Sequence, residues 1–365
     1  MRLLTLPALA LLFAAPAWAQ TEEDVTFPSS PGVVLAGTLT VPDGPGPFPA
    51  VVLASGSGPQ DRDGGPAAGV VPDSLQMYRR LAHALADRGI LVLRVDDRGT
   101  GESTIEGDPA TMTSLDLVDD IAAGVGVLAA RDDVGWIGVV GHSEGGMLAP
   151  LAAERSDVDG LVLVGATAEP GYETILDQNR TIGLAPLGLS DAELAAVLGP
   201  LREMFVLISE DPDAELTEAE RARARELFIA SNQAIPQEKA TAFGLTPERL
   251  EAMADASLPS LTSRAFRTFL SLDPAGYLER VSVPTLGLFF ELDQQVPPAR
   301  NAQPMRDALG RSASPAWEVT TLSGVNHVMQ TAETGAVAEY RTLAADIDPA
   351  VAATIADWVL STAGE

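Results

Sequence analysis

The chain has 365 residues, of which 46% are hydrophobic, and its 51 acidic and 23 basic side chains give a formal net charge of −28. This length is enough for one large α/β domain or two smaller ones. The acidic surface repels phosphate groups, which argues against nucleic acid and anionic membranes as partners. The sequence contains no cysteine, which excludes disulfides, thiolate metal sites and a lipoprotein membrane anchor.

The first nineteen residues have the pattern of an export signal. Arg2 supplies a positive start, residues 3–15 form an apolar run too short to span a bilayer, and Ala17-Trp18-Ala19 makes an A-x-A cleavage site. A short buried N-terminal helix is the alternative for the same segment. We expect removal of residues 1–19 and an exported protein, periplasmic or secreted, whose mature chain starts near Gln20.

Short apolar runs recur along the rest of the chain, separated by segments with helical periodicity. The expected strands are residues 33–41, 50–54, 90–95, 137–140, 161–164, 285–290 and 317–322. The expected helices are residues 75–88, 114–130, 301–309 and 349–360. Most of these strands lack polar alternation, which is typical of a parallel sheet covered on both faces. The sequence therefore predicts an α/β fold with a mostly parallel sheet and helices on both of its faces.

Residues 169–275 interrupt this alternation, because helix starts are evident there and strands are not. Ser190 and Thr217 each stand three residues before a glutamate, which makes two capping boxes, and Thr246 is followed by proline at the first helical position. We interpret this segment as a helical cap inserted into a core made of residues 20–168 and 276–365. A surface decoration is the alternative, but the insertion follows a strand whose end should face the site described next.

Residues 136–148, WIGVVGHSEGGML, combine a buried strand, a G-x-S-x-G turn and the start of a helix. A serine on such a strand-to-helix turn has strained backbone angles, and its hydroxyl stands exposed above the sheet edge. Gly141 and Gly145 leave room for the neighbouring chain to pass close to Ser143. A chance match among 33 glycines is the alternative, but the strand before and the helix after favour a nucleophile elbow with Ser143 as the nucleophile.

A serine hydroxyl needs a general base, usually an imidazole, to act as a nucleophile near neutral pH. The chain has three histidines. His83 lies inside an expected helix, and the side chain of His142, next to Ser143, should point away from it. His327 follows the last expected strand, where a loop can reach back over the sheet edge, so His327 is the predicted base.

The base in turn needs a carboxylate from a loop at the same sheet edge. Asp293, three residues beyond an expected strand, meets that condition, and Glu291 is the runner-up. Asp273 precedes a proline ahead of that strand, on the wrong side. The resulting order Ser143, Asp293, His327 is the order that α/β-hydrolases use.

The tetrahedral intermediate of acyl transfer needs hydrogen-bond donors for its oxyanion. One is expected from the backbone N–H of Glu144, the residue after the nucleophile. The second is expected from the loop after residues 50–54, with the N–H of Ser57 first and that of Gly58 next. A nucleotide-phosphate loop is a poor alternative, because the sequence has no GxxxxGK[ST] pattern.

Two charged segments lie near this predicted site. Residues 96–103, DDRGTGES, could touch substrate, but an internal Asp–Arg pair that braces the loop beneath the elbow is the better interpretation. Residues 60–64, QDRDG, follow the oxyanion loop directly. A role in shaping the pocket mouth and a freely solvated loop are equally good interpretations of them.

Five motifs recur in an order known from one family. They are SGSGPQDRDG (55–64), DDRGTGES (96–103), GHSEGG (141–146), LDQQVPP (292–298) and NH (326–327). They resemble bacterial α/β-hydrolase carboxylesterases related to the acyl-CoA thioesterase and bile-acid acyltransferase group, with serine aminopeptidases as more distant relatives. The resemblance runs from about residue 33 to residue 360 and is weakest in the helical insertion.

The resemblance implies the α/β-hydrolase fold and the roles assigned above to Ser143, Asp293 and His327. It also implies hydrolysis of short to medium acyl esters without a cofactor or a metal. Phe290 is a departure, because relatives often carry a small residue there, and we expect its ring to narrow the pocket.

The leading hypothesis is an exported serine carboxylesterase that hydrolyses a small-molecule ester through an acyl-enzyme on Ser143. Acyl-thioester hydrolysis is an alternative, but acyl-CoA is an intracellular substrate and export argues against it. An aminopeptidase would need an acidic cluster for the substrate's ammonium group, and the acids of the insertion show no convergent spacing. A non-catalytic binding protein on a hydrolase scaffold conflicts with an intact set of nucleophile, base and acid.

Overall fold

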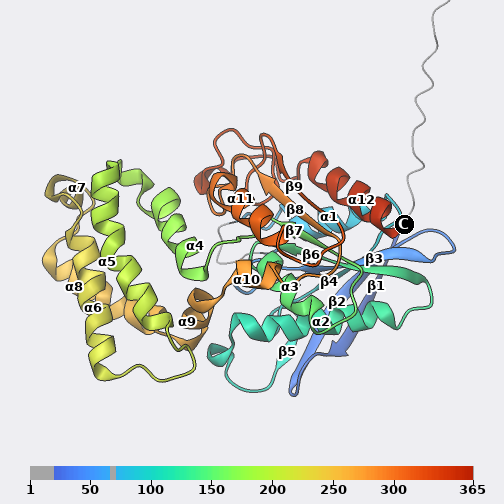
Figure 1. Cartoon of the computed structure of the whole chain (residues 1–365), viewed down its shortest axis with the longest axis horizontal. Coiled ribbons are helices and arrows are strands. Elements are labelled where there is room, and N and C mark those ends of the chain that lie inside the picture. Colours follow the sequence, from blue (N-terminus) through green and yellow to red (C-terminus); the bar gives the residue numbers. More distant parts are fainter. Residues whose placement is uncertain (1–19, 66–70, 365) are drawn as a thin grey trace, which may run out of the picture.

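The computed structural model describes residues 20–65 and 71–364 of the chain (Figure 1). The export signal expected in residues 1–19 therefore lies outside the described residues. The described part has two lobes, a sheet flanked by helices and a purely helical lobe beside it (Figure 1).

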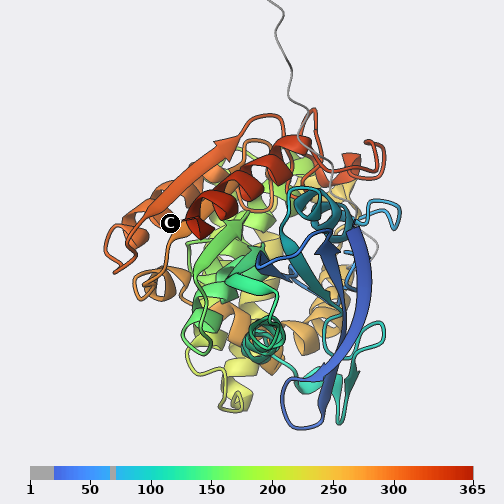
Figure 2. The ribbon, with the colours of Figure 1, turned by 90° about the vertical axis from the view of Figure 1, so that its right-hand side faces the viewer.

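A nine-stranded sheet forms the larger lobe, in the order β1-β2-β4-β3-β6-β7-β8-β9, with β5 paired to β2. Its strands are β1 (Gln20–Pro28), β2 (Val33–Pro42), β3 (Phe48–Ala54), β4 (Leu91–Val95), β5 (Thr104–Ile105), β6 (Val134–His142), β7 (Gly160–Val164), β8 (Thr285–Phe290) and β9 (Trp317–Leu322). The pairs β1–β2 and β2–β4 are antiparallel, and every pair from β4 across to β9 is parallel. Blue strands and an orange strand mark the two edges of this sheet in Figure 2. The predicted α/β fold with a mostly parallel sheet is confirmed.

Strand β1 was not predicted from the sequence, because it lies at the sheet edge and most of its side chains are exposed. Phe27 is its one buried side chain, so it has neither an apolar run nor a clear alternation. Its pairing with β2 along the full length of the strand supplies what its own sequence does not show.

Helices cover both faces of the sheet. In this lobe they are α1 (Met77–Ala86), α2 (Ser114–Ala129), α3 (Glu144–Ala153), α10 (Pro274–Leu278), α11 (Pro298–Leu309) and α12 (Pro349–Ala363). One apolar cluster joins α1 and α12 to the sheet, and a second joins α2, α3, α10 and α11 to its other face. Helix α1 stops just before Gly89, whose φ of +85° is a conformation that glycine adopts without strain. The predicted helices are thus present, with ends shifted by up to three residues.

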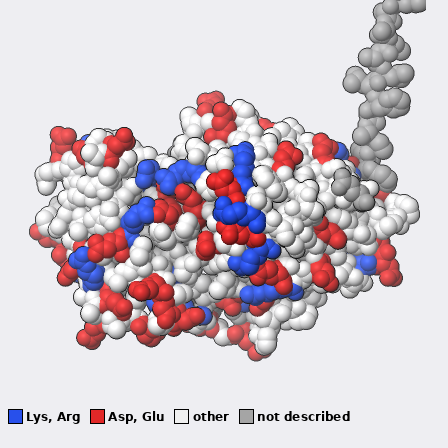
Figure 3. All heavy atoms as spheres, viewed as in Figure 1, with Lys and Arg blue, Asp and Glu red and all other residues white. Residues whose placement is uncertain are grey.

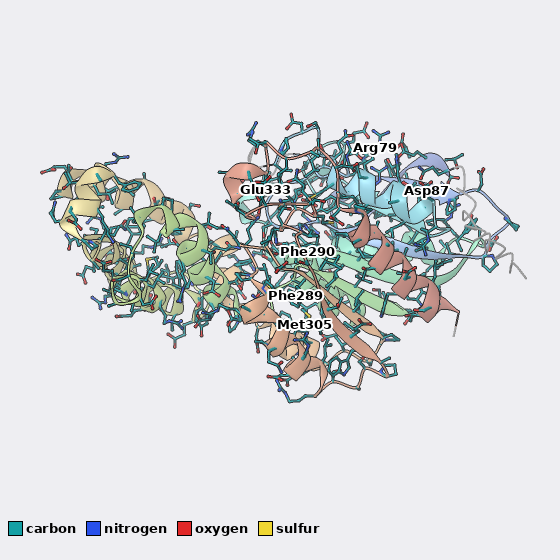
Figure 4. All side chains as sticks on the ribbon, turned by 90° about the horizontal axis from the view of Figure 1, so that it is seen from above. Arg79, Asp87, Phe289, Phe290, Met305 and Glu333 are labelled. Atoms are coloured by element: carbon teal, nitrogen blue, oxygen red, sulfur yellow. The ribbon has the colours of Figure 1, made fainter. Side chains whose placement is uncertain are left out.

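Phe289 and Phe290, consecutive residues of β8, point to opposite faces of the sheet (Figure 4). Phe289 packs in the same cluster as Met305 of α11, whereas Phe290 packs in the cluster of α1 and α12. Phe290 is fully buried there and does not line the active-site cavity. The expectation that its ring narrows the pocket is therefore wrong.

The smaller lobe contains only helices and turns between Gly165 and Pro284, all of which the structure describes. Its helices are α4 (Gly171–Gln178), α5 (Asp191–Ser209), α6 (Glu218–Gln233), α7 (Gln237–Ala242), α8 (Pro247–Leu261) and α9 (Arg264–Ser271), and a π-helical turn, Asn179–Gly183, follows α4. The predicted capping residues Ser190, Thr217 and Thr246 accept backbone N–H groups at the starts of α5, α6 and α8. Two apolar clusters of its own hold this lobe together.

Acidic side chains are spread over both lobes, and many basic ones lie beside them (Figure 3). Arg225, for example, pairs with Glu251 and Asp255 on neighbouring helices of the smaller lobe. Exposed pairs of this kind contribute little stability individually. None of the described helices is long and apolar enough to cross a membrane.

Candidate active site

The loops that follow β3, β6, β8 and β9 meet at the carboxyl ends of the parallel strands, where open α/β sheets bind ligands. Together with α4, α8 and α9 of the smaller lobe they enclose a cavity of about 770 Å³. The predicted residues Ser143, Glu144, Ser57, Gly58 and His327 all line it. Loops far apart in the sequence therefore contribute to one site.

Ser143 occupies a strained turn between β6 and α3. Its φ of 54° is unusual for a residue with a side chain, and its backbone N–H donates to the Val164 carbonyl at 2.8 Å. The glycines around it are sterically required: a Cβ on Gly145 would lie 2.5 Å from two carbonyl oxygens at the end of β3, and one on Gly141 would lie 2.5 Å from the Gly145 carbonyl. This is the geometry of a nucleophile elbow.

His327 is held by Asp293. Its Nδ1 lies 2.7 Å from Asp293 Oδ2, and both side chains are buried. The other carboxylate oxygen, Oδ1, accepts the backbone N–H groups of Gln295 and Val296 at 2.8 Å each, which fixes the carboxylate in place. With Nδ1–H donated to Asp293, the Nε2 of His327 is the nitrogen left to exchange protons.

Three of the four residues that were not chosen for the triad have partners elsewhere. Glu291 accepts hydrogen bonds from the Ser323 hydroxyl and the Gly324 N–H, so it braces the loop after β9 rather than the imidazole. Asp273 caps α10 by accepting from the Gly276 N–H at 3.3 Å. His83 contacts Glu22 of β1 on the outer surface of α1.

Glu144, Ser57 and Gly58, the residues that carry the expected oxyanion donors, all line the cavity. Glu144 is the first residue of α3, so its N–H has no acceptor within the helix. Within residues 20–65 and 71–364, no acceptor takes a hydrogen bond from the N–H of Ser57 or Gly58 either. The N–H of Gly56 is different, because it donates to the Tyr78 hydroxyl at 2.8 Å.

Comparison with known proteins agrees with this geometry. Residues 71–196 match the family described as Hydrolase_4: Serine aminopeptidase, S33. Two solved structures share the architecture. One is Est1E from Butyrivibrio proteoclasticus with bound ferulic acid, which matches 93% of this chain and all of Est1E with a TM-score of 0.51 and 16% identity. The other is an open form of a lipase, which matches 94% of this chain and all of the lipase with a TM-score of 0.54 and 19% identity. The chain has the α/β-hydrolase fold.

Esterase EstD of Thermotoga maritima is also similar to this chain, with 39% identity over 168 residues. Those residues are 45% of this chain and 37% of EstD, so the match spans well under half of that esterase. The similarity to esterases and to aminopeptidase-like hydrolases that the motifs predicted is therefore confirmed over these parts of the chain.

Two further residues lie at the site, and no role was predicted for them. Tyr78 of α1 places its hydroxyl 3.0 Å from His142 Nδ1, and His142 Nε2 lies 2.9 Å from the His327 carbonyl. Burial, and then the charge of His327, lower the pKa of His142 to about 3, and burial raises the pKa of the Tyr78 phenol. No sequence signal singles out Tyr78, since its position on α1 is that of an ordinary core residue.

The segment after the oxyanion loop is anchored rather than freely solvated. Gln60 lines the cavity, and Arg62 makes three hydrogen bonds to the Asp96 carboxylate, one from its backbone N–H and two from its guanidinium. Asp63 pairs with the buried Arg94 of β4. Residues 60–64 are therefore not a freely solvated loop, although within this segment Gln60 alone lines the cavity.

The pairing expected inside the 96–103 loop is wrong. Arg98 reaches away from its own loop and binds the Asp120 carboxylate of α2, with both distances at 2.7 Å, while Asp96 pairs with Arg62. Asp97 instead accepts the Ser55 hydroxyl and the Gln60 N–H. Burial, supported by the charges of Asp120 and Glu144, raises the pKa of the Asp97 carboxyl to about 7.

The described residues contain no group of three or more His, Cys, Asp or Glu side chains arranged to hold a metal ion. The site as described consists of a hydroxyl, an imidazole, a carboxylate and backbone N–H groups. These are the parts required for nucleophilic acyl transfer.

Proposed function

We propose that this protein is a serine carboxylesterase that acts through an acyl-enzyme on Ser143. The observation that carries the proposal is the strained elbow serine facing one cavity together with an imidazole that is itself held by a buried carboxylate. The similarity to EstD over part of the chain supports the same chemistry.

In the acylation step, His327 Nε2 takes the proton of the Ser143 hydroxyl as Oγ attacks the ester carbonyl carbon. The oxyanion then accepts hydrogen bonds from the N–H groups of Glu144 and Ser57, with Gly58 next in line. His327 returns the proton to the departing alcohol, and the acyl group stays on Ser143. A water molecule, deprotonated by His327, attacks the acyl-enzyme in the same way, and the acid leaves. Asp293 holds the imidazole tautomer and stabilises the imidazolium throughout.

The lining of the cavity supports a neutral ester of short to medium size as the substrate. Apolar side chains from both lobes contribute most of its walls: Val71, Met77, Ile175, Phe266, Phe269 and Val328. Its volume of about 770 Å³ is within the range of small-molecule sites. Apart from Glu144 and the other residues of the proposed catalytic site, the polar side chains that line it are uncharged: Gln60, Ser114, Gln178, Ser260, Ser263 and Gln295.

We also propose that the helical segment, residues 169–275, works as a cap over this site. Ile175 and Gln178 of α4, Ser260 of α8 and Phe266 and Phe269 of α9 all line the cavity. The cap also contacts the loop after β8 that carries Asp293, because the Thr181 hydroxyl donates to the Gln294 carbonyl at 2.6 Å. Substrate preference would then depend on the cap side chains.

An aminopeptidase is the second candidate, because the matching family is described as serine aminopeptidase. Such an enzyme needs a carboxylate that is available for the substrate's ammonium group. Glu169 and Asp177, where the cap begins, are instead paired with Arg300 of α11. Glu144 is the carboxylate that lines the cavity, next to the nucleophile. The pairing of Glu169 and Asp177 favours the esterase, whereas Glu144 keeps the aminopeptidase a candidate for the test below.

Hydrolysis of p-nitrophenyl esters of increasing acyl length, with amino-acid p-nitroanilides in parallel, tests the proposal. Ester turnover that disappears in Ser143→Ala is expected, with an unchanged melting temperature. Ser361→Ala is the matched control, since that serine is exposed on α12, does not line the cavity and should leave turnover intact. Anilide turnover without ester turnover would select the aminopeptidase, and activity that survives in Ser143→Ala would refute the proposed nucleophile.

Export is proposed on the pattern of residues 1–19 alone. Expression of the full chain in a bacterial host, followed by fractionation and N-terminal sequencing, is the direct measurement. A mature chain that begins at Gln20 in the periplasm or medium is expected. An uncleaved chain that stays in the cytoplasm would contradict export.

A further inference from the structure

Four groups around the nucleophile form a continuous chain of hydrogen bonds. The Gly56 N–H donates to the Tyr78 hydroxyl at 2.8 Å, the hydroxyl lies 3.0 Å from His142 Nδ1, and His142 Nε2 lies 2.9 Å from the His327 carbonyl. The chain connects the oxyanion loop to the loop that carries the proposed base. It runs through the side chain of the residue that immediately precedes Ser143.

The direction of each hydrogen bond follows from the groups involved. A carbonyl oxygen can only accept, so His142 Nε2 must carry the hydrogen that it gives to His327. In the neutral ring Nδ1 is then an acceptor, and the Tyr78 hydroxyl donates to it while its oxygen accepts from Gly56. Burial favours the neutral ring. Each hydrogen in the chain thereby has an acceptor.

We propose that Tyr78 and His142 act as a positioning pair. They hold the oxyanion loop, which carries Ser57, and the loop that carries His327 in fixed positions relative to Ser143. The inference rests on the proposed esterase function. Neither side chain is proposed to exchange a proton with substrate. Each acts through the backbone of a neighbouring group.

The packing shows how tightly the pair holds these elements. A Cβ on Gly56 would lie 3.3 Å from both His142 Nδ1 and Ser143 Cβ, so the loop passes directly over the elbow. The rings of His142 and His327 lie 4.9 Å apart, and those of Tyr78 and His142 lie 5.9 Å apart. A hydrogen bond at Gly56 orients the next peptide, whose N–H is the expected oxyanion donor of Ser57. Small displacements at such a site are costly, since a misplacement of about 1 Å can lower the rate about 100-fold.

Three substitutions separate the links of the chain. Tyr78→Phe removes the hydroxyl and frees the Gly56 N–H. His142→Gln retains a donor near the Nε2 position for His327 but loses the acceptor for Tyr78. His142→Asn retains an acceptor near Nδ1 but cannot reach the His327 carbonyl. Tyr277→Phe is the matched control, because Tyr277 lies on α10 and does not line the cavity.

The kinetic expectation is a loss in kcat with little change in KM. For Tyr78→Phe we expect kcat to fall about 10- to 100-fold, with KM within about twofold of the wild-type value. Affinity for phenylboronic acid, which forms a tetrahedral adduct on the serine, should fall with kcat/KM, and Tyr277→Phe should change neither. The double variant Tyr78→Phe/His142→Gln should lose less than the product of the single losses, because both break the same link.

Suppose that the wild type is active and that Tyr78→Phe and both His142 variants keep full kcat and full boronate affinity. This result would overturn the positioning role of Tyr78 and His142 and leave the proposed esterase function standing. Wild type without hydrolase activity would overturn the proposed function and, with it, the catalytic meaning of the pair. Circular dichroism identifies a variant that fails to fold, and the remaining two substitutions then decide the question.

A measurement that does not depend on turnover checks the hydrogen bonds themselves. The chain has three histidines, so ¹⁵N-histidine labelling gives a simple spectrum. His142 should show the neutral tautomer with hydrogen on Nε2, and the Gly56 amide should exchange faster in Tyr78→Phe than in wild type. A His142 ring that carries its hydrogen on Nδ1, or on both nitrogens near neutral pH, contradicts the proposed chain.

Discussion

Acid should destabilise the folded protein partly through His142, and the size of this effect can be derived from its burial. The ring is 4% exposed and contacts Tyr78 and the His327 backbone. Burial and the charge of His327 lower its pKa from 6.5 to about 3, against smaller opposing effects of the hydrogen bond to the His327 backbone and of the charge of Asp293. In the unfolded chain the ring titrates near its ordinary value.

The sign follows from which state binds the proton. Between pH 6.5 and about pH 3 the unfolded chain is protonated at His142 and the folded chain is not. Falling pH therefore favours unfolding through this residue, by about 1.4 kcal/mol per pH unit. Between about pH 7 and about pH 4.5 the stabilisation lost amounts to about 3 kcal/mol.

Guanidinium chloride unfolding of wild type and His142→Gln, at constant ionic strength over this pH range, isolates the contribution. Glutamine does not titrate, so the difference in free energy of unfolding between the two proteins should shrink by about 3 kcal/mol as the pH falls. Tyr277→Phe should follow the wild-type curve throughout. A difference that stays constant within about 1 kcal/mol would refute the neutral burial of His142.

Three further expectations concern the elbow, the acid and the cap. Gly145→Ala places a Cβ 2.5 Å from two carbonyl oxygens and should lower the free energy of unfolding by about 2 kcal/mol or more. The control Gly126→Ala, in α2 with open space around it, should be neutral or stabilising. Similar unfolding midpoints for the two variants would contradict this expectation. Asp293→Asn should lower kcat about 10⁴-fold while Glu291→Gln retains turnover, and steady-state kinetics showing the reverse ranking would exchange their roles. Phe269→Ala removes part of the apolar wall, so KM should rise roughly tenfold for longer acyl esters and less for acetyl esters; a rise independent of chain length would argue against acyl binding there.

The local features of the site could be predicted from the sequence because each depends on a few neighbouring residues. A serine between glycines after a buried strand predicts a strained turn whatever the rest of the chain does, and Ser143 has a φ of 54°. Apolar runs likewise predict strands, and capping boxes predict helix starts, from the residues of the segment itself. With three histidines available and the strand ends known, the pairing of His327 with Asp293 follows from order along the chain.

Tertiary structure decided what depends on which segments meet. Tyr78 and His142 are 64 residues apart and His142 and His327 are 185 apart, and no local pattern encodes their contact. The buried Arg98 pairs with Asp120 on α2 rather than with a neighbour in its own loop, and this contact depends on how the loop packs against the helix.

Strand β8 shows the same limit inside the core. Its sequence is apolar on both faces, because helices cover both sides of the sheet, so no alternation tells which face Phe290 joins. Residue type and spacing determined the chemistry that this chain carries, whereas strand register and helix packing determined which of its side chains surround Ser143.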